Sequence, residues 1–301
     1  MESRFRADHG LTRRMVLVMF MLGLVYVVFM GVVITLTGHI VIPIVIALAF
    51  AAGQWFLSDK VALMALGAHD VTPEQAPELH GMIDRLCALS NTPKPRIAFA
   101  ETRVPNAFAT GRSQKHAVIV VTRGILDRLT PEELEGVLSH ELSHIAHKDV
   151  AVMTIASFLG VLAGIAARYG MYAQMDRGRD QNTAIILLGV WAASIAVYAL
   201  SFVLTRALSR YRELAADRSA AYLTGRPSEL ASALVKLSDG MKSIPDKDIR
   251  KSAAMNAFAF APAFKPGKMG AGFSRLVSTH PSTEQRLEQL AKISTELSRP
   301  V

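Results

Sequence analysis

The chain has 301 residues, of which 51% are hydrophobic and 19% are charged, and its formal net charge is +8. An ordinary soluble domain has about 25% charged residues, so this composition favours membrane-spanning segments. The single cysteine, Cys87, excludes an intramolecular disulfide. A basic chain can bind nucleic acid, but no basic run is interleaved with aromatic residues, so we expect no nucleic-acid partner.

Four uncharged apolar runs predict transmembrane helices, because about 20 residues cross a bilayer. They cover residues 15–36, 40–57, 150–167 and 184–204. The first run is too long for a cleaved signal peptide and lacks a small-residue cleavage site after it, so we interpret it as an anchor. The lipid bilayer is therefore an expected partner.

The distribution of basic residues predicts the orientation of these spans. Arginines precede the first run, and Lys and Arg are plentiful in 58–149 and 206–301. The segment 176–180, between the third and fourth runs, sums to zero charge. The positive-inside rule therefore predicts that both termini and both long polar segments are cytoplasmic.

Between the second and third runs, the pattern predicts a small α+β region. Helical spacing of apolar residues and a Thr-Pro-Glu start favour a helix over 73–90. Short alternating or β-branched runs predict strands at 96–100 and 116–122, in a hairpin-like sheet. The segment 104–111 between them is interpreted as irregular, and 123–129 as a short helix. An edge strand of this sheet could pair with an extended peptide, although the sheet could also be purely structural.

The next helix carries the motif His-Glu-x-x-His. His140 and His144 are one helical turn apart and point the same way, so they can hold one zinc ion. Glu141 is adjacent to the first ligand and can act as the general base of a hydrolase. A five-residue pattern can arise by chance, but the Thr-Pro-Glu-Glu run at 130–133 predicts a capped helix start just upstream, as the mechanism requires.

A catalytic zinc needs a third protein ligand. His147 is close in sequence, but it lies on the same straight helix as His140 and His144, which cannot wrap around one ion. If the third and fourth apolar runs form an antiparallel hairpin, and the zinc helix runs straight into the third run, Glu213 comes level with His144. Glu213 is therefore the predicted third ligand.

Two further interpretations concern the helix predicted over 206–223. The competing reading of Glu213 is a salt bridge with Arg210 or Arg212 on a solvated helix face. Asp217 lies one turn beyond Glu213, and we expect it to accept an imidazole N–H and fix the tautomer of a ligand histidine.

The remaining chain predicts two helices separated by a loop-rich stretch. Ser228 is expected to cap a helix that runs to about residue 241. Residues 242–275 are rich in Pro, Gly and Phe and are interpreted as a lid or flap. Ser282 with Gln285 predicts the start of a last amphipathic helix.

Four motifs carry a resemblance to a known family: NAFATG at 106–111, HELSH at 140–144, RELAAD at 212–217 and THPSTE at 279–284. The sequence resembles the HtpX-like family of membrane zinc peptidases, relatives of the CAAX prenyl proteases. The resemblance implies a zinc metalloendopeptidase of the gluzincin type, with one zinc ion per chain. It implies ligation by His140, His144 and Glu213, with Glu141 as the catalytic base. At 147, where the family more often has asparagine, this chain has histidine.

The resemblance also implies a role and a place in the cell. It implies quality control under stress, through cleavage of misfolded or damaged membrane proteins, at the cytoplasmic side of a bacterial inner membrane. His280 of the His-Pro motif is expected to donate to the oxyanion, or else only to begin a helix. Substrate contacts are expected from Asn106, Ala107 and Phe108.

These expectations define a fold class: a mainly α integral membrane protein with four transmembrane helices and a cytosolic α+β zincin-like catalytic domain containing a small sheet. The predicted division is an N-terminal hairpin at 1–57, catalytic segments at 58–149 and 206–301, and a second hairpin at 150–205. One alternative is a CAAX-type prenyl protease, which has a larger set of spans. Another is a catalytically silent peptide-binding scaffold, against which the intact Glu141 and Glu213 argue.

Overall fold

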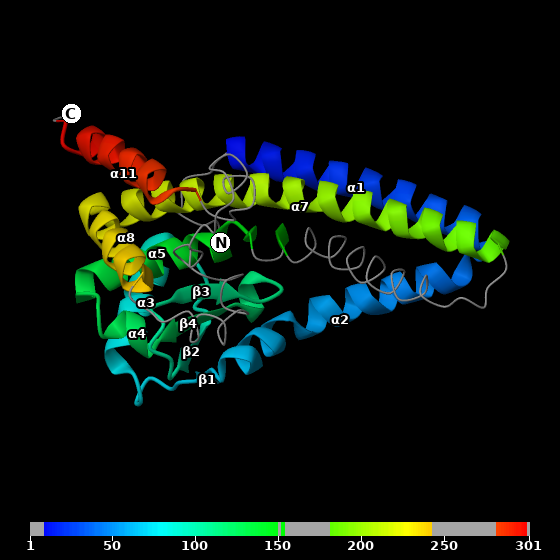
Figure 1. The fold of residues 1–301 in the computed structure, drawn as a ribbon. Helices are drawn as coiled ribbons and strands as arrows, with labels where there is room; N and C mark the ends of the chain where they lie inside the picture. The colour runs from blue at the N-terminus through cyan, green and yellow to red at the C-terminus, as the bar shows by residue number, and fades with distance from the viewer. Residues whose placement is uncertain (1–8, 150–151, 154–180, 243–280, 300–301) are drawn as a thin grey trace. The chain divides into compact units, whose positions relative to one another are not determined.

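A computed structural model describes residues 9–149, 152–153, 181–242 and 281–299 of the chain (Figure 1). The chain divides into two compact units. We call the first the mixed unit; it comprises Met1–Leu11, Ser58–Ala151 and Ser209–Val301. We call the second the helical unit; it comprises Thr12–Leu57 and Val152–Leu208. The predicted third apolar run and the loop-rich stretch 242–275 lie largely outside the described residues.

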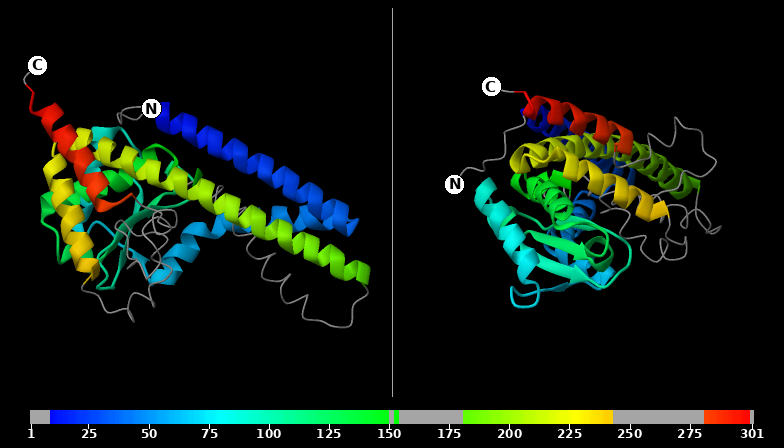
Figure 2. Two further views of the ribbon diagram at one scale, coloured as in Figure 1. Left: turned by 45° about the horizontal axis from the view of Figure 1, so that its top comes forward. Right: turned by 90° about the vertical axis from the view of Figure 1, so that its left-hand side faces the viewer.

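The described part of the helical unit is built from parts of three helices, α1 (His9–Thr37), α2 (Val41–Leu66) and α7 (Gln181–Thr224). Within it, α1 and α7 run antiparallel and side by side (Figures 1 and 2). Leu22, Phe29 and Met30 of α1 form a small core there, packed against apolar residues of α7. All three helices lack acidic residues in their first turn and basic residues in their last turn.

Two described helices are long and apolar enough to cross a membrane, His9–Thr35 and Leu188–Thr224. They correspond to the first and fourth predicted runs. The apolar part of α2, Val41–Leu57, is shorter. The described residues therefore support two of the four predicted spans by length and composition.

The sheet of the mixed unit has four strands in the order β1-β2-β4-β3. The strands are β1 (His69–Asp70), β2 (Arg96–Ala100), β3 (Ala107–Thr110) and β4 (Val118–Thr122). β2 and β4 are parallel, and the other two pairs are antiparallel. The predicted hairpin-like pairing is therefore wrong, and so is the irregular assignment of 104–111, which contains β3.

The missed strand β3 has a physical reason. The strand has only four residues, Ala-Phe-Ala-Thr, and its two alanines are depleted in strands, so its own sequence is a weak strand signal and pairing with β4 makes it extended. Gly111 follows β3 with a φ of +129°, and a Cβ there would come within 2.3 Å of the carbonyl oxygen of His116. Glycine is therefore required where the chain turns back toward β4.

Both faces of the sheet are covered. Val118 and Val120 of β4 pack with Ala62 of α2 on one face, while Ile119 and Val121 join the main core on the other. The main core is completed by α3 (Pro77–Ser90) and α5 (Pro131–Ala146), which lie on that second face. β4 is buried on both faces, and its sequence is accordingly apolar from Val118 to Val121.

Two helix starts in this region differ from one another. α5 begins as predicted, with Thr130 as its N-cap and a reciprocal capping box from Glu133. α3 begins at Pro77, four residues later than predicted, because 72–76 forms a turn in which the amide of Thr72 bonds to the side chain of Gln75. The short helix α4 spans Arg123–Leu126.

α5 ends at Ala146, so the prediction that it runs straight into the third apolar run is wrong. His147 is its C-cap, and Lys148 adopts the left-handed conformation with a φ of +60°. A residue in that conformation commonly ends an α-helix.

Among the described residues, the last two helices of the mixed unit are α8 (Pro227–Lys242) and α11 (Thr283–Leu297). α8 packs on α5, and α11 packs on α8 (Figure 2). Gly136 allows the close approach of α5 and α8, because a Cβ on it would lie 3.3 Å from the backbone nitrogen of Leu230. α11 begins with the predicted capping box of Ser282 and Gln285.

Candidate metal centre

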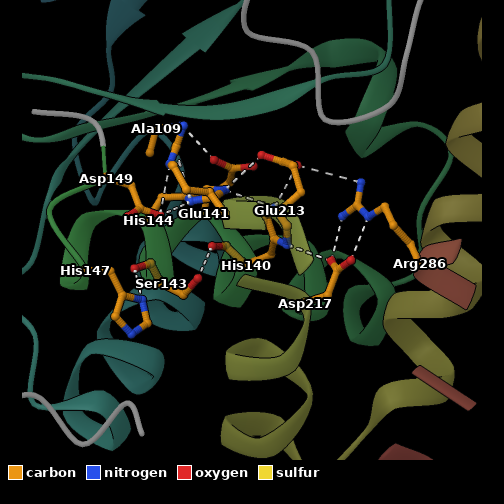
Figure 3. Close-up of polar contacts among 11 residues, drawn as sticks. Ala109, His140, Glu141, Ser143, His144, His147, Asp149, Glu213, Asp217 and Arg286 are labelled. Carbon is orange, nitrogen blue, oxygen red and sulfur yellow. Dashed lines mark hydrogen bonds and ion pairs between the residues drawn. The ribbon is translucent and has the colours of Figure 1, made fainter. Parts of the chain in front are cut away.

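Three predicted ligands come together inside the mixed unit (Figure 3). His140 and His144 lie on α5, and Glu213 lies on α7. One ligand atom from each lies within 4.8 Å of the other two, and all three residues are buried. The competing reading of Glu213, on a solvated face, is wrong because the residue is only 5% exposed.

The spacing of these atoms suits a small cation. The two Nε2 atoms are 3.2 Å apart, and the Glu213 carboxylate lies 3.6 Å from Nε2 of His140 and 3.5 Å from Nε2 of His144. Zinc with ligands at about 2.0–2.2 Å in a tetrahedron separates its ligands by roughly 3.3 Å. Two imidazoles and one carboxylate therefore fit a zinc ion in both type and spacing.

A carboxylate orients each imidazole through its other nitrogen. Asp217 Oδ1 lies 2.9 Å from Nδ1 of His140, which is the contact expected for Asp217. Asp149 Oδ2 lies 2.8 Å from Nδ1 of His144. With both Nδ1 atoms engaged in this way, both Nε2 atoms are left to face the centre.

An arginine accompanies each of these carboxylates. Arg286 of α11 donates to both oxygens of Asp217, at 2.7 and 2.6 Å, and its Nη1 lies 3.9 Å from Glu213. Arg212 Nε lies 3.3 Å from Asp149. Burial of these carboxylates would disfavour their charge, but the arginines outweigh it, and the pKa values of Asp217 and Asp149 are lowered.

The same contacts act on the imidazoles. Burial alone would lower the pKa of His144, but hydrogen bonds to Asp149 and Glu213 raise it to about 9. Burial also opposes protonation of His140, and hydrogen bonds to Asp217 and Glu213 raise its pKa. The carboxylates around the two imidazoles thus favour a positive charge at the centre, carried either by protons or by a metal ion.

Glu141 lies beside this centre and is 4% exposed. Its Oε2 accepts a hydrogen bond of 2.8 Å from the backbone amide of Ala109 in β3, and Figure 3 shows its carboxylate next to that of Glu213. Burial raises the pKa of Glu141, with Glu213 adding to the rise. A carboxylate with a raised pKa is suited to taking up a proton and returning it near neutral pH.

The other predicted site residues lie elsewhere. Asn106, Ala107 and Phe108 are at or in β3, but the side chains of Ala107 and Phe108 are packed into the cores on the two faces of the sheet. These two side chains are therefore not available to contact a substrate. His147 Nδ1 hydrogen-bonds to the carbonyl of Ser143 at 2.9 Å, outside the ligand cluster. His280 lies outside the described residues.

The residues that sequence reasoning missed are Ala109, Asp149, Arg212 and Arg286. Asp149 had a weak signal, an acid five residues after His144 at the end of the motif helix. Arg286 had none, because its partner Asp217 is 69 residues away in the chain.

The sequence profile of Peptidase family M48 matches residues 73–294. Protease HtpX homolog 1 of Streptomyces coelicolor is 56% identical over 299 residues, 99% of this chain and 97% of that protein. Protease HtpX homolog 2 of Methanosarcina acetivorans is 48% identical over 299 residues, 99% of this chain and 100% of that protein.

The fold is similar to that of a protein of known structure. The crystal structure of Ste24p from S. mikatae has a TM-score of 0.54 and 16% sequence identity to this chain. The similarity covers 89% of this chain and 62% of that protein.

Proposed function

Since the chain belongs to peptidase family M48 and is a membrane-associated metalloprotease, we propose that it is a zinc endopeptidase of misfolded or damaged membrane proteins. The proposal places cleavage at the cytosolic side of the membrane and the role in stress-related quality control. The observation that carries it is the buried convergence of His140, His144 and Glu213 beside Glu141.

In this proposal, Nε2 of His140, Nε2 of His144 and the Glu213 carboxylate hold one zinc ion. When bound, zinc supplies a Lewis acid that acidifies water and polarises the scissile carbonyl. The three side chains come from two helices whose ligand positions are already gathered within 4.8 Å. Little side-chain movement is then needed on binding, which limits the entropic cost.

Glu141 takes the proton of the attacking water and passes it to the leaving amine. Its buried position and raised pKa suit both transfers. The hydrogen bond from Ala109 fixes the Glu141 carboxylate against β3, so the base is held in place before substrate arrives.

The outer edge of β3 is proposed to bind the peptide in extended form. Among the described residues, β3 is an edge strand, and β4 is its neighbour in the sheet. The amide of Ala109 points away from β4, toward α5, because it donates to Glu141. Backbone groups alternate along a strand, so those of Ala107 face the same way and can pair with a substrate next to the base. Recognition through the backbone suits a protease that cleaves many sequences.

We also propose that the division at 1–57, 58–149, 150–205 and 206–301 separates membrane hairpins from catalytic segments. Reporter fusions after residue 70, within 220–240 and at the C-terminus are expected to report the cytosol, and a fusion near Arg177 the opposite side. A fusion at 220–240 that reports the outside contradicts the cytosolic site.

The catalytic proposal is tested with Glu141→Gln. Purified in detergent, this variant is expected to bind one zinc ion per chain by elemental analysis and to lose casein hydrolysis by about 10²–10⁴-fold, the usual contribution of a general base. Glu135→Gln is the matched control, because Glu135 is on the same helix but pairs with Arg85 at the surface. Hydrolysis by Glu141→Gln at the wild-type rate overturns the mechanism.

The quality-control role needs its own test. A membrane protein and a destabilised variant of it are each reconstituted with the enzyme in vesicles. Faster cleavage of the destabilised variant is expected, and equal cleavage of the two forms overturns the proposed substrate class while leaving the peptidase assignment intact.

A further inference from the structure

Each of the two ligand histidines is held by a carboxylate, and each carboxylate is paired with an arginine. His140 is held by Asp217 with Arg286, as described above. His144 is held by Asp149, which carries Arg212 at 3.3 Å. Asp149 is 1% exposed and Arg212 is 8% exposed, so both charges are buried beside the ligand. Burying a charge costs desolvation free energy, so charged side chains are buried where they pair with one another.

The backbone brings Asp149 to this position through a turn. Asp149 follows the last turn of α5 by three residues and would point away from His144 on a continued helix, because residues five apart are not on the same face. The left-handed Lys148, with its amide bonded to the carbonyl of Ile145, interrupts the helix there. A non-glycine residue in this conformation costs roughly 1 kcal/mol, and such strain is concentrated at functional sites.

We propose that Asp149, held by Arg212, is a positioning residue that keeps Nε2 of His144 directed at the metal. This inference rests on the proposed zinc site. Asp149 accepts the Nδ1 proton of His144, which fixes the tautomer and the plane of the ring. No group besides Asp149 among the described contacts of His144 Nδ1 can accept that proton, since Arg212 Nη2, at 3.4 Å, is itself a donor.

Removal of the Asp149 carboxylate therefore does more than delete one hydrogen bond. Two donors, the Nδ1–H of His144 and the guanidinium of Arg212, would face each other without an acceptor between them. The ring would turn away from the arginine, and Nε2 would leave the centre. The substitution Asp149→Asn would keep an acceptor for Nδ1–H but lose the charge that attracts Arg212, so it should rescue part of the effect.

The experiment measures metal binding by the full-length protein in detergent. Zinc affinity is determined by competition with a chromogenic chelator, and Co²⁺ is added as a spectroscopic probe of ligand geometry. Asp149→Ala is expected to weaken zinc binding by about 10–100-fold, the usual effect of losing a carboxylate behind a ligand imidazole, and to change the Co²⁺ spectrum. Asp149→Asn should fall between Asp149→Ala and wild type.

Two controls separate local from general effects. Lys148→Gly keeps the left-handed turn and should bind zinc as wild type does. Asp127→Asn removes an exposed carboxylate at the end of α4 and should also leave binding unchanged.

The outcomes distinguish this inference from the proposed site. If wild type binds one zinc ion and Asp149→Ala binds it with equal affinity and an unchanged Co²⁺ spectrum, the positioning role is overturned while the site stands. The same holds if Asp149→Ala only lowers the melting temperature. If wild type binds no zinc, the proposed function fails and this inference fails with it.

Discussion

The mixed unit buries charged side chains, whereas the helical unit exposes apolar ones. Among the described residues, the mixed unit contains all the buried acidic and basic side chains, including Glu133, Glu141, Asp149, Glu213 and Arg286. In the described part of the helical unit, the buried polar residues are serines, and most of the large exposed side chains are apolar, with Val27 at 67% exposure.

The difference shows what each unit needs from its surroundings. The mixed unit buries charges because each has an opposite charge or a hydrogen-bond partner, and the apolar core around them keeps water out. The helical unit has little interior of its own and exposes apolar surface, which a bilayer accepts and water does not. We therefore propose that the mixed unit carries the chemistry and that the helical unit associates with the membrane.

The largest effect is expected from removing a buried charge of the mixed unit. Glu213→Ala removes the anionic ligand and leaves two imidazoles, so zinc content should fall to near zero and casein hydrolysis should vanish. His147→Asn is the control, because His147 bonds to the carbonyl of Ser143 and lies outside the ligand cluster. Elemental analysis of both purified variants decides the assignment. Loss of zinc from His147→Asn with retention by Glu213→Ala contradicts it.

The second prediction places a charge on the apolar exterior of the helical unit. Val27→Asp in α1 should disfavour membrane insertion by about 2.5–3.5 kcal/mol, the cost of a carboxylate at the centre of a span. Leu89→Asp is the matched change in the mixed unit, where Leu89 is 45% exposed on α3, and it should shift stability by less than about 0.5 kcal/mol. Carbonate extraction of membranes and thermal unfolding measure the two effects. Equal effects at the two positions would remove the distinction between the units.

A smaller effect is expected at Glu133, a buried carboxylate that links α5 to α8. It accepts hydrogen bonds from Ser232 at 2.6 Å and Lys236 at 2.8 Å, and caps its own helix. Lys236 is half-exposed, so water can solvate it once the carboxylate is removed. Glu133→Ala should therefore cost only about 1–3 kcal/mol of unfolding free energy. Urea unfolding at neutral pH measures this loss, with the exposed Glu132→Ala as control.

The Glu133 effect should depend on pH in one direction. Burial favours a higher pKa, but the bonds from Lys236 and Ser232 outweigh it, so the pKa of Glu133 is lowered from 4.5 in the folded chain. Its stabilisation is then fully present above about pH 4.5 and is lost as the pH falls through the lower folded value. The difference in unfolding free energy between wild type and Glu133→Ala should therefore shrink as the pH falls below about 4.5. A difference that stays constant down to about pH 3 would contradict this account.

The smallest prediction compares two glycines. Gly136→Ala places a Cβ 3.3 Å from the Leu230 backbone and should destabilise the mixed unit by up to about 1 kcal/mol. Gly31→Ala, in α1, has no atom within 4 Å and should be neutral or gain from its higher helix propensity. Thermal unfolding in detergent tests the pair, and equal shifts would show that α5 and α8 are less closely packed than described.

Local chemistry explains which predictions succeeded. The capping boxes at Thr130 and Ser282 are short-range signals, and the structure confirms both helix starts. The start of α3 was predicted too early, because Thr72 and Gln75 form a local turn instead of a helix. Strand β3 could not be found from its own residues, since its conformation depends on β4.

The sequence by itself determined the motif helix, the apolar spans as candidates and the ligand types, because helix periodicity, hydropathy and side-chain chemistry are local properties. Only the tertiary structure decided which charges meet. Arg286 reaches Asp217 from 69 residues away, and Asp149 reaches His144 through the left-handed turn at Lys148. Such pairs depend on how the helices pack and on where a helix ends. The positions of two residues along the chain do not show whether the residues are close in space.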